Sequence, residues 1–126
     1  MNPGSVFISH SSKPPDFDLT KVLAGKLTRC GLNVWWDKDG LEGGHEFTAE
    51  IVEAIIRQHY FLFLLSKHSA TSKWCRRELA RASELGKTII PFKAIQEEAE
   101  IARAAFYVLA RVKGVHHPKS IGRCRH

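Results

Sequence analysis

The run from Tyr60 to Leu65 places the strongest constraint on what this chain can fold into. Its residues are aromatic or aliphatic, with no polar interruption. A strand that is apolar at every position is buried on both faces, which is typical of a central strand in a parallel sheet covered by helices on each side. The run therefore predicts an α/β fold rather than an antiparallel sheet with one face in water.

Segments with strand and helix patterns alternate on both sides of this run. The expected strands are residues 5–10, 32–36, 60–65 and 88–92, and the expected helices are 16–30, a helix ending near 58, 73–85 and 97–105. Asp16 or Asp18 is expected to cap the first helix and Ser72 the third, with Gly86 as the stop after the third. Pro91 indicates a strand end or an edge strand. Residues 106–109 suit either an extension of the last helix or a fifth strand.

This alternation implies right-handed crossovers and a mainly parallel sheet between two helical layers. Ligands of such sheets bind outside the carboxyl ends of the strands. Three segments must meet at that edge, namely residues 9–12, 37–45 and 66–78. Connectivity alone therefore indicates where the chemistry should take place.

Size and composition indicate one soluble domain. The chain has 126 residues, of which 44% are hydrophobic and 25% charged. No run approaches the roughly 20 apolar residues that span a bilayer, and the N-terminus lacks the pattern of a signal peptide. Cys30, Cys75 and Cys124 are odd in number and widely spaced, which fits neither a disulfide framework nor a zinc site. We therefore expect a cytoplasmic protein without a membrane partner.

The net charge of +6 does not describe the body of the chain. Residues 1–102 carry 13 basic and 13 acidic side chains, and residues 103–126 carry six basic side chains and no acidic one. A basic surface for nucleic acid is therefore not expected on the folded body. We expect a domain over residues 1–116 and a poorly ordered, dispensable basic tail over residues 117–126.

Several short motifs occur in order along the first three quarters of the chain. They are Phe7–Ser12, Trp36-Asp37 with Leu41, Gly44 and Phe47, Leu65-Ser66, Ser72–Leu79 with its W-x-x-x-E pattern, and Ile89–Pro91. Together they resemble a Toll/interleukin receptor (TIR) domain, in particular the NAD-cleaving TIR domains of bacteria. The resemblance extends to about residue 94. It implies a three-layer sandwich with flavodoxin-like winding and strand order 2-1-3-4-5.

The resemblance implies one of two roles. Many TIR domains cleave NAD or make cyclic ADP-ribose products, and others only assemble with one another. The enzymatic members carry a glutamate at the position matched by Glu78, so we predict that Glu78 is catalytic. NAD would be the substrate, and no separate cofactor is expected. The leading hypothesis is an NAD glycohydrolase or ADP-ribosyl cyclase activated by self-association in defence or cell-death signalling, and the alternative is a non-enzymatic TIR–TIR interaction module.

Chemistry supports a single carboxylate at this position. Loss of nicotinamide leaves positive charge on the ribose, which a carboxylate can stabilise while it orients the hydroxyls. Trp74 lies four residues earlier and hence on the same helix face, where its ring could wall the ribose pocket. The alternative without a role in catalysis is that Trp74 belongs to the core and Glu78 is a solvated partner of Arg81 or Arg77.

Other residues at the predicted ligand edge are candidates for contact with substrate or with a second molecule. The substrate-binding candidates are Phe7, Ser9, His10, Ser11, Phe47 and Trp74. The glycine-rich loop that follows the second strand is a candidate lid and assembly contact, through Asp37, Gly40, Leu41, Gly43 and Gly44. The chain has no Gly-rich dinucleotide fingerprint and no P-loop, and its histidines and cysteines have no metal-ligand spacing, so no metal is expected.

Overall fold

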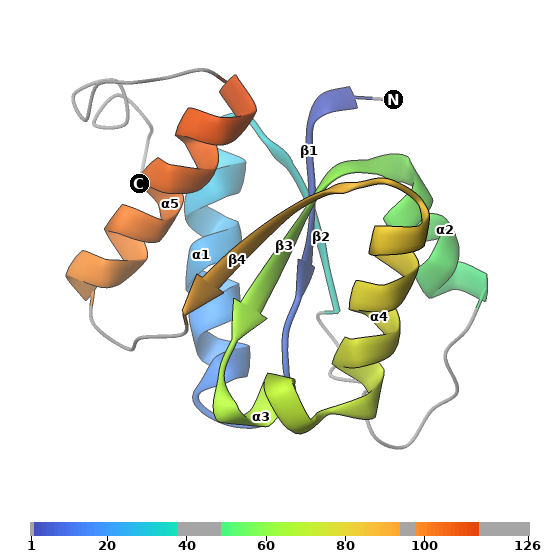
Figure 1. Ribbon diagram of the computed structural model, residues 1–126. Coiled ribbons are helices and arrows are strands. Elements are labelled where there is room, and N and C mark those ends of the chain that lie inside the picture. Colours follow the sequence, from blue (N-terminus) through green and yellow to red (C-terminus); the bar gives the residue numbers. More distant parts are fainter. Residues whose placement is uncertain (1, 38–48, 94–97, 114–126) are drawn as a thin grey trace.

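The computed structural model describes residues 2–37, 49–93 and 98–113. Figure 1 shows its elements, which in chain order are β1 (Asn2–Ser9), α1 (Asp16–Arg29), β2 (Asn33–Trp36), α2 (Ala49–Arg57), β3 (Gln58–Leu65), α3 (Lys67–Thr71), α4 (Lys73–Glu84), β4 (Thr88–Lys93) and α5 (Glu98–Lys113). The expected alternation of strands and helices is confirmed.

The sheet of the described residues has four parallel strands in the order β2-β1-β3-β4. Phe7 pairs with Phe61 across β1 and β3, and Pro91 lies on β4, which is the edge strand expected to tolerate it. The predicted order is confirmed for these four strands. Within the described ranges there is no fifth strand, because residues 106–109 continue α5. The sequence pattern of residues 106–109 suited both a helix extension and a fifth strand, and the helix is what forms.

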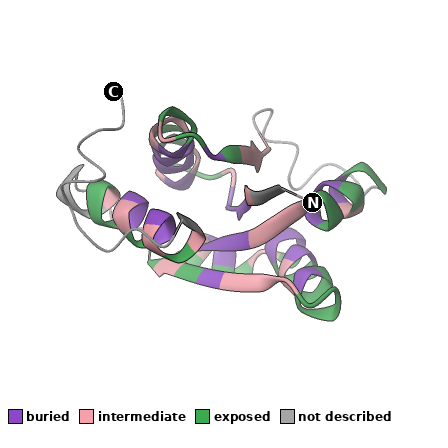
Figure 2. Ribbon diagram, turned by 90° about the horizontal axis from the view of Figure 1, so that it is seen from above, coloured by how far each residue is buried: buried purple, intermediate pink, exposed green. Residues whose placement is uncertain are grey.

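Helices cover both faces of this sheet. In Figure 1, α1 and α5 lie together on one side, and α2 and α4 lie together on the other. Figure 2 shows the same three layers from above. Successive side chains of β1 pack on opposite faces of the sheet. Val6 and Ile8 lie in the core under α1 and α5, whereas Phe7 lies in the core under α2 and α4. The three-layer α/β sandwich is therefore confirmed.

The apolar run of β3 is buried as predicted over most of its length. Residues 61–64 are buried and contribute alternately to the two cores, while Leu65 is 43% exposed. Leu65 ends the strand at the carboxyl edge, beyond the cover of the flanking helices. That edge lies at the bottom of Figure 1, where the arrowheads point and where the short helix α3 lies.

Three local expectations meet different outcomes. The Ser72 hydroxyl accepts a hydrogen bond from the Cys75 backbone N–H and caps α4, and Gly86 ends that helix with a φ of +70°, both as predicted. The prediction that Asp16 or Asp18 caps α1 is wrong, because Pro15 occupies that position and no side chain caps the helix. Asp16 is instead the first helical residue, and its carboxylate is engaged elsewhere.

The cysteine spacing indicated no disulfide framework, yet Cys30 is disulfide-bonded, whereas Cys75 is free and buried. Among the described residues no helix is long and apolar enough to cross a membrane. The predicted tail at 117–126 lies outside the described residues. So do Phe47 and the loop residues Gly40, Leu41, Gly43 and Gly44.

Candidate functional site

The end of β1 brings a buried carboxylate and a buried hydroxyl together. The Ser9 Oγ donates a hydrogen bond to Glu78 Oε1 at 2.7 Å, although 69 positions separate the two residues. Ser9 is 1% exposed and Glu78 is 3% exposed. Chain connectivity had predicted that residues 9–12 and 66–78 meet at the carboxyl edge of the sheet, and this hydrogen bond joins those segments.

Helix α4 turns Glu78 toward the sheet. Its buried residues include Trp74, Glu78 and Ala82, which are spaced four apart and so share one face, as expected for the first two. Trp74 packs in the core beneath α2 and α4. The alternative of a core Trp74 and a solvated Glu78 paired with Arg81 or Arg77 holds for Trp74 but not for a solvated Glu78, which is buried. The Arg81 Nη1 contacts Glu84 Oε2 at 3.5 Å.

Phe7 lies deeper than its predicted contact with substrate suggests. Its ring stacks between Trp35 and Phe61, with centroid separations of 4.8 Å and 5.3 Å, and the residue is 1% exposed. Phe7 is therefore a core residue of β1, two positions before Ser9. Its packing holds in place the strand that carries Ser9.

His10 and Ser11 continue β1 into the edge, and both are almost completely buried, at 5% and 2% exposure. The His10 Nδ1 lies 2.9 Å from the Ser11 carbonyl oxygen, and the Ser11 Oγ accepts a hydrogen bond from the Lys13 backbone N–H. The His10 ring lies near the rings of Phe17 and Trp36. Within the described part of the chain, the His10 Nε2 has no hydrogen-bond partner.

The sequence had not indicated a second buried carboxylate at this edge, that of Asp16. It accepts a hydrogen bond from the Ser66 hydroxyl, which also accepts hydrogen bonds from the backbone N–H groups of His68 and Ser69 at 3.2 Å and 3.0 Å. Ser66 and Ser69 form the capping box of α3. A serine followed three residues later by a second side chain that can bond back, directly after an apolar strand, was the signal that could have located this helix start.

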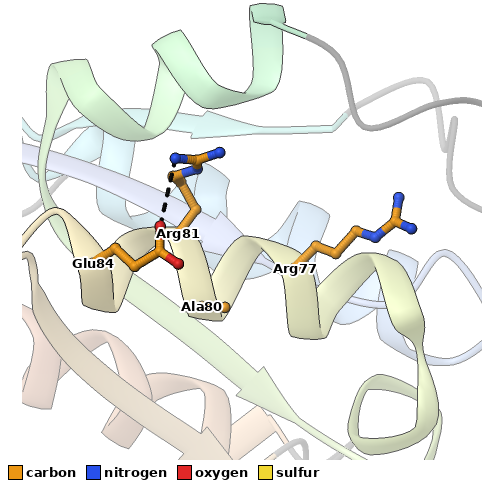
Figure 3. Close-up of a pocket in the computed structure, with 4 residues that line it drawn as sticks. All are labelled: Arg77, Ala80, Arg81 and Glu84. Carbon is orange, nitrogen blue, oxygen red and sulfur yellow. Dashed lines mark ion pairs between the residues drawn. The ribbon is translucent and has the colours of Figure 1, made fainter.

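The outer face of α4 presents a different surface. A hollow of about 380 Å³ lies there, lined by Arg77, Ala80, Arg81 and Glu84, which Figure 3 shows on α4. Arg77 and Arg81 are exposed, whereas Glu78 is buried and does not line it. The hollow is therefore separate from the Ser9–Glu78 pair. Asp37, the one predicted loop residue inside the described ranges, is half-buried just after β2.

No group of metal-ligating side chains occurs among residues 2–37, 49–93 and 98–113. The described edge offers the buried carboxylates of Asp16 and Glu78, serine hydroxyls and an imidazole.

Comparison with protein families matches residues 6–116 to the model described as TIR domain. The match covers all the described strands and helices except the first residues of β1.

Two curated relatives carry names that describe reactions of NAD or its products. The chain is 33% identical over 73 residues to a probable 2' cyclic ADP-D-ribose synthase, TcpO, of Methanobrevibacter olleyae, which covers 58% of this chain and 21% of the relative. It is 32% identical over 90 residues to the NAD(+) hydrolase TcpA of a Theionarchaea archaeon, which covers 68% of this chain and 27% of the relative. The chain thus spans about a fifth to a quarter of the length of these relatives.

Among solved structures, the chain is similar to the TIR domains of the activated Roq1 resistosome, which directly recognizes the pathogen effector XopQ. The TM-score is 0.63 at 19% identity, with 85% of this chain and 69% of that chain covered. At this identity the similarity shows the fold alone, and it agrees with the parallel sheet and its two helical layers.

Proposed function

This chain belongs to the TIR domain family, and we propose that it cleaves the bond between nicotinamide and ribose in NAD, with Glu78 as the catalytic carboxylate. The observation that carries the proposal is the hydrogen bond from Ser9 to Glu78 in a buried position at the carboxyl edge of the sheet. Relatives named as an NAD hydrolase and as a probable cyclic ADP-ribose synthase support it. Their names support NAD as the substrate of the proposed reaction.

The reaction needs little acid–base help at its first step. The bond from the ribose C1′ to the nicotinamide nitrogen breaks, and its electron pair stays on that nitrogen, so the cationic ring leaves as neutral nicotinamide. Positive charge develops on the ribose as the bond breaks. A carboxylate against the ribose stabilises this charge more in the transition state than in the ground state, which is the condition for a gain in rate.

Ser9 serves as a positioning residue in this scheme. Its hydroxyl fixes Glu78 Oε1 from the rigid end of β1, so the carboxylate does not need to reorganise while charge develops. A hydrogen bond to a charged acceptor is stronger than one between neutral groups. Ser9 thereby acts through Glu78 rather than through direct contact with NAD.

The second step decides the product. Attack of water at C1′, with loss of a proton, gives ADP-ribose, whereas attack by a hydroxyl of the other ribose gives a cyclic product. Both outcomes share the first step and the same carboxylate. The proposal therefore covers a glycohydrolase and an ADP-ribosyl cyclase.

We further propose that self-association with other TIR domains activates this site in defence or cell-death signalling in the cytoplasm. Glu78 is only 3% exposed, so ribose reaches it after a rearrangement at the edge of the sheet. The glycine-rich segment 37–45 is the proposed contact, because ordering each of its residues costs about 1–2 kcal/mol of backbone entropy that a neighbouring molecule would offset. Neither a nucleic acid nor a membrane partner forms part of the proposal.

The same burial favours one alternative function. A carboxylate at 3% exposure is also what a non-enzymatic TIR–TIR interaction module would contain if Glu78 only tied α4 to β1. That module would retain the fold and the assembly surface and would release no nicotinamide.

The decisive experiment measures nicotinamide release from NAD over hours by purified protein at high concentration with a crowding agent. Release by the parent chain, its loss in Glu78→Gln and a rise in activity per molecule with concentration are the expected results. No release by the parent under these conditions replaces the enzyme with the interaction module. Constant specific activity across a wide dilution series removes the requirement for assembly alone.

A further inference from the structure

An aromatic side chain lies exposed between two arginines on α5. Tyr107 is 43% exposed, and Arg103 and Arg111 are exposed as well. Residues four positions apart share a helix face, so these three side chains form one row, which we call the α5 row. Helix α5 covers one face of the sheet, and α4, which carries Glu78, covers the other (Figure 1). The α5 row therefore lies on a different side of the molecule from the helix that carries Glu78.

The ring of Tyr107 is held in place by its neighbours. Phe92 of β4 makes a T-shaped contact with it, with ring centroids 5.5 Å apart and an interplanar angle of 78°. The Arg111 Nη1 donates a long hydrogen bond of 3.4 Å to the Tyr107 Oη, and the Arg111 carbonyl oxygen accepts one of the same length from the Tyr60 Oη. A T-shaped contact covers at most one face of a ring. The neighbours thus fix the position of an exposed ring and leave it a face for stacking.

The charge along this helical layer is positive beyond its first turns. The acidic residues of α5, Glu98 and Glu100, both belong to the start of the helix, and no acidic residue follows them. Helices α1 and α5 each follow the carboxyl end of a parallel strand and contact one another, so both run back in the same direction. Lys26 and Arg29, in the last turn of α1, therefore lie at the same end of the layer as Arg111 (Figure 1).

Helix dipoles account for only part of this charge. Cations are favoured in the last turn of a helix, which explains Lys26, Arg29 and Arg111 without any ligand. Arg103 lies in the first half of α5, where the dipole gives a cation no advantage. The sequence predicted a neutral body as far as residue 102, yet Arg103, Arg111 and Lys113 belong to α5 and hence to the folded body rather than to the tail. The α5 row thus combines a fixed aromatic ring with positive charge on both sides of it.

We propose that the α5 row binds single-stranded nucleic acid, with a base stacked on Tyr107 and backbone phosphates on Arg103 and Arg111. Proteins bind such strands through positive charge along the backbone and aromatic rings on which bases stack. The row extends over eight residues of helix, about 12 Å, so a short stretch of strand can contact both arginines. This inference is independent of the proposed function, because it uses none of the residues around Glu78.

The exposed ring favours a single strand over other polyanions. A duplex keeps its bases stacked on one another, so it offers phosphates to the arginines and no free base to Tyr107. An acidic polypeptide supplies carboxylates and again leaves the ring without a partner. Affinity for the α5 row should therefore depend on the aromatic ring as well as on the two charges.

The test of the charges measures binding of labelled oligo(dT) and oligo(U) to the parent chain by fluorescence anisotropy over a range of salt concentrations. For single strands the logarithm of the association constant falls with the logarithm of salt concentration by about 0.7 per neutralised phosphate. We expect a slope of about −1.4 or steeper for the parent, and a slope shallower by about 0.7 for Arg103→Gln and for Arg111→Gln. Arg76→Gln removes an exposed charge from α4 and is the matched control, whose slope should equal that of the parent.

The test of stacking uses Tyr107→Leu, which removes the ring, and Tyr107→Phe, which keeps the ring and removes only the hydroxyl. Loss of one stacked base should weaken binding by about fivefold to a hundredfold in Tyr107→Leu. Tyr107→Phe should stay within about twofold of the parent, with folding of both variants checked by circular dichroism.

Four results would overturn the proposal. They are no binding of either oligonucleotide by the parent at low salt, equal affinity of parent and Tyr107→Leu, binding of duplex DNA as tightly as of the single strand, and equal competition by polyglutamate of matched charge. A loss of slope in Arg76→Gln as large as in Arg111→Gln would also overturn it, because binding would then follow net charge rather than the α5 row. None of these results bears on cleavage of NAD at Glu78.

Discussion

Two buried carboxylates lie at the same edge of the sheet in two different settings. Asp16 and Glu78 are 1% and 3% exposed, and each accepts a hydrogen bond from a serine hydroxyl. Asp16 begins α1 and meets Ser66, whose hydroxyl also caps α3. Glu78 lies within α4 and meets Ser9 at the end of β1, where the described contacts of the serine cap no helix.

Under the proposed function, the difference separates a carboxylate that supports the fold from one that supports the reaction. The Ser66 hydroxyl closes a network of two backbone N–H groups and one carboxylate, so loss of Asp16 disturbs the junction between β3, α3 and α1. The Ser9 hydroxyl and the Glu78 carboxylate instead hold one another where ligands of parallel sheets bind. Mutation of the two acids should therefore affect stability in one case and activity in the other.

The largest effect is expected for Glu78→Gln on NAD cleavage. The amide keeps the shape of the side chain and an oxygen for Ser9, but it removes the charge. Loss of such an electrostatic group costs roughly a hundredfold to a thousandfold in rate, about 3–4 kcal/mol. NAD affinity should weaken far less, and unfolding by denaturant should change little. Nicotinamide release by equally folded parent and variant is the measurement. Similar rates would show that Glu78 is not catalytic and would end its contrast with Asp16.

Asp16→Ala should give the opposite pattern. The Ser66 hydroxyl would lose a charged acceptor in a buried position. Hydrogen bonds to charged groups contribute about 1.5–3 kcal/mol, so the free energy of unfolding should fall by about that amount. Asp16→Asn, which keeps an acceptor oxygen, is the control and should lose less. Urea denaturation and nicotinamide release per folded molecule are both followed, and a variant that is stable but inactive would place Asp16 in the site.

A smaller effect on rate is expected for Ser9→Ala. The carboxylate of Glu78 would remain but would lose the hydroxyl that fixes Oε1. Loss of one such bond should lower kcat by about fivefold to tenfold, with KM nearly unchanged. Ser9→Thr keeps the hydroxyl and should recover most of the rate. A change confined to KM would mean that Ser9 contacts NAD directly rather than through Glu78.

Local signals in the sequence were enough for most of the fold. The apolar run of β3, the Ser72 cap and Gly86 each act within a few residues, so their effect can be predicted without the rest of the chain. Residues 106–109 suited two structures because a short apolar segment fits a helix or a strand equally well. The helix forms, and the Ala104, Ala105, Val108 and Leu109 side chains pack into the core that α1 also lines.

The candidate site was predictable only where a motif marked it. Glu78 stands in the W-x-x-x-E pattern, and Ser9 ends a recognisable strand. Asp16 resembled an ordinary helix cap, because its true partner, Ser66, is 50 positions away and belongs to another element. The contact of the His10 Nδ1 with the Ser11 carbonyl oxygen follows from backbone geometry rather than from residue type. The sequence therefore did not predict contacts between residues far apart in the chain or contacts made by main-chain groups.

The smallest effect is expected for Arg81→Ala, which tests whether the two faces of α4 are independent. Arg81 contacts Glu84 at 3.5 Å on the outer face, where the two side chains are 45% and 67% exposed. An exposed pair of this kind contributes about 0–1 kcal/mol, because solvent and salt screen it. The free energy of unfolding should therefore change by less than about 0.5 kcal/mol, and kcat should stay within about twofold of the parent. Glu84→Ala is the matched control, since it removes the same contact from the other side. If Arg81→Ala alone lowered NAD cleavage tenfold or more, the arginine would serve the reaction rather than the surface pair. The outer hollow of Figure 3 would then belong to the same site as Ser9 and Glu78.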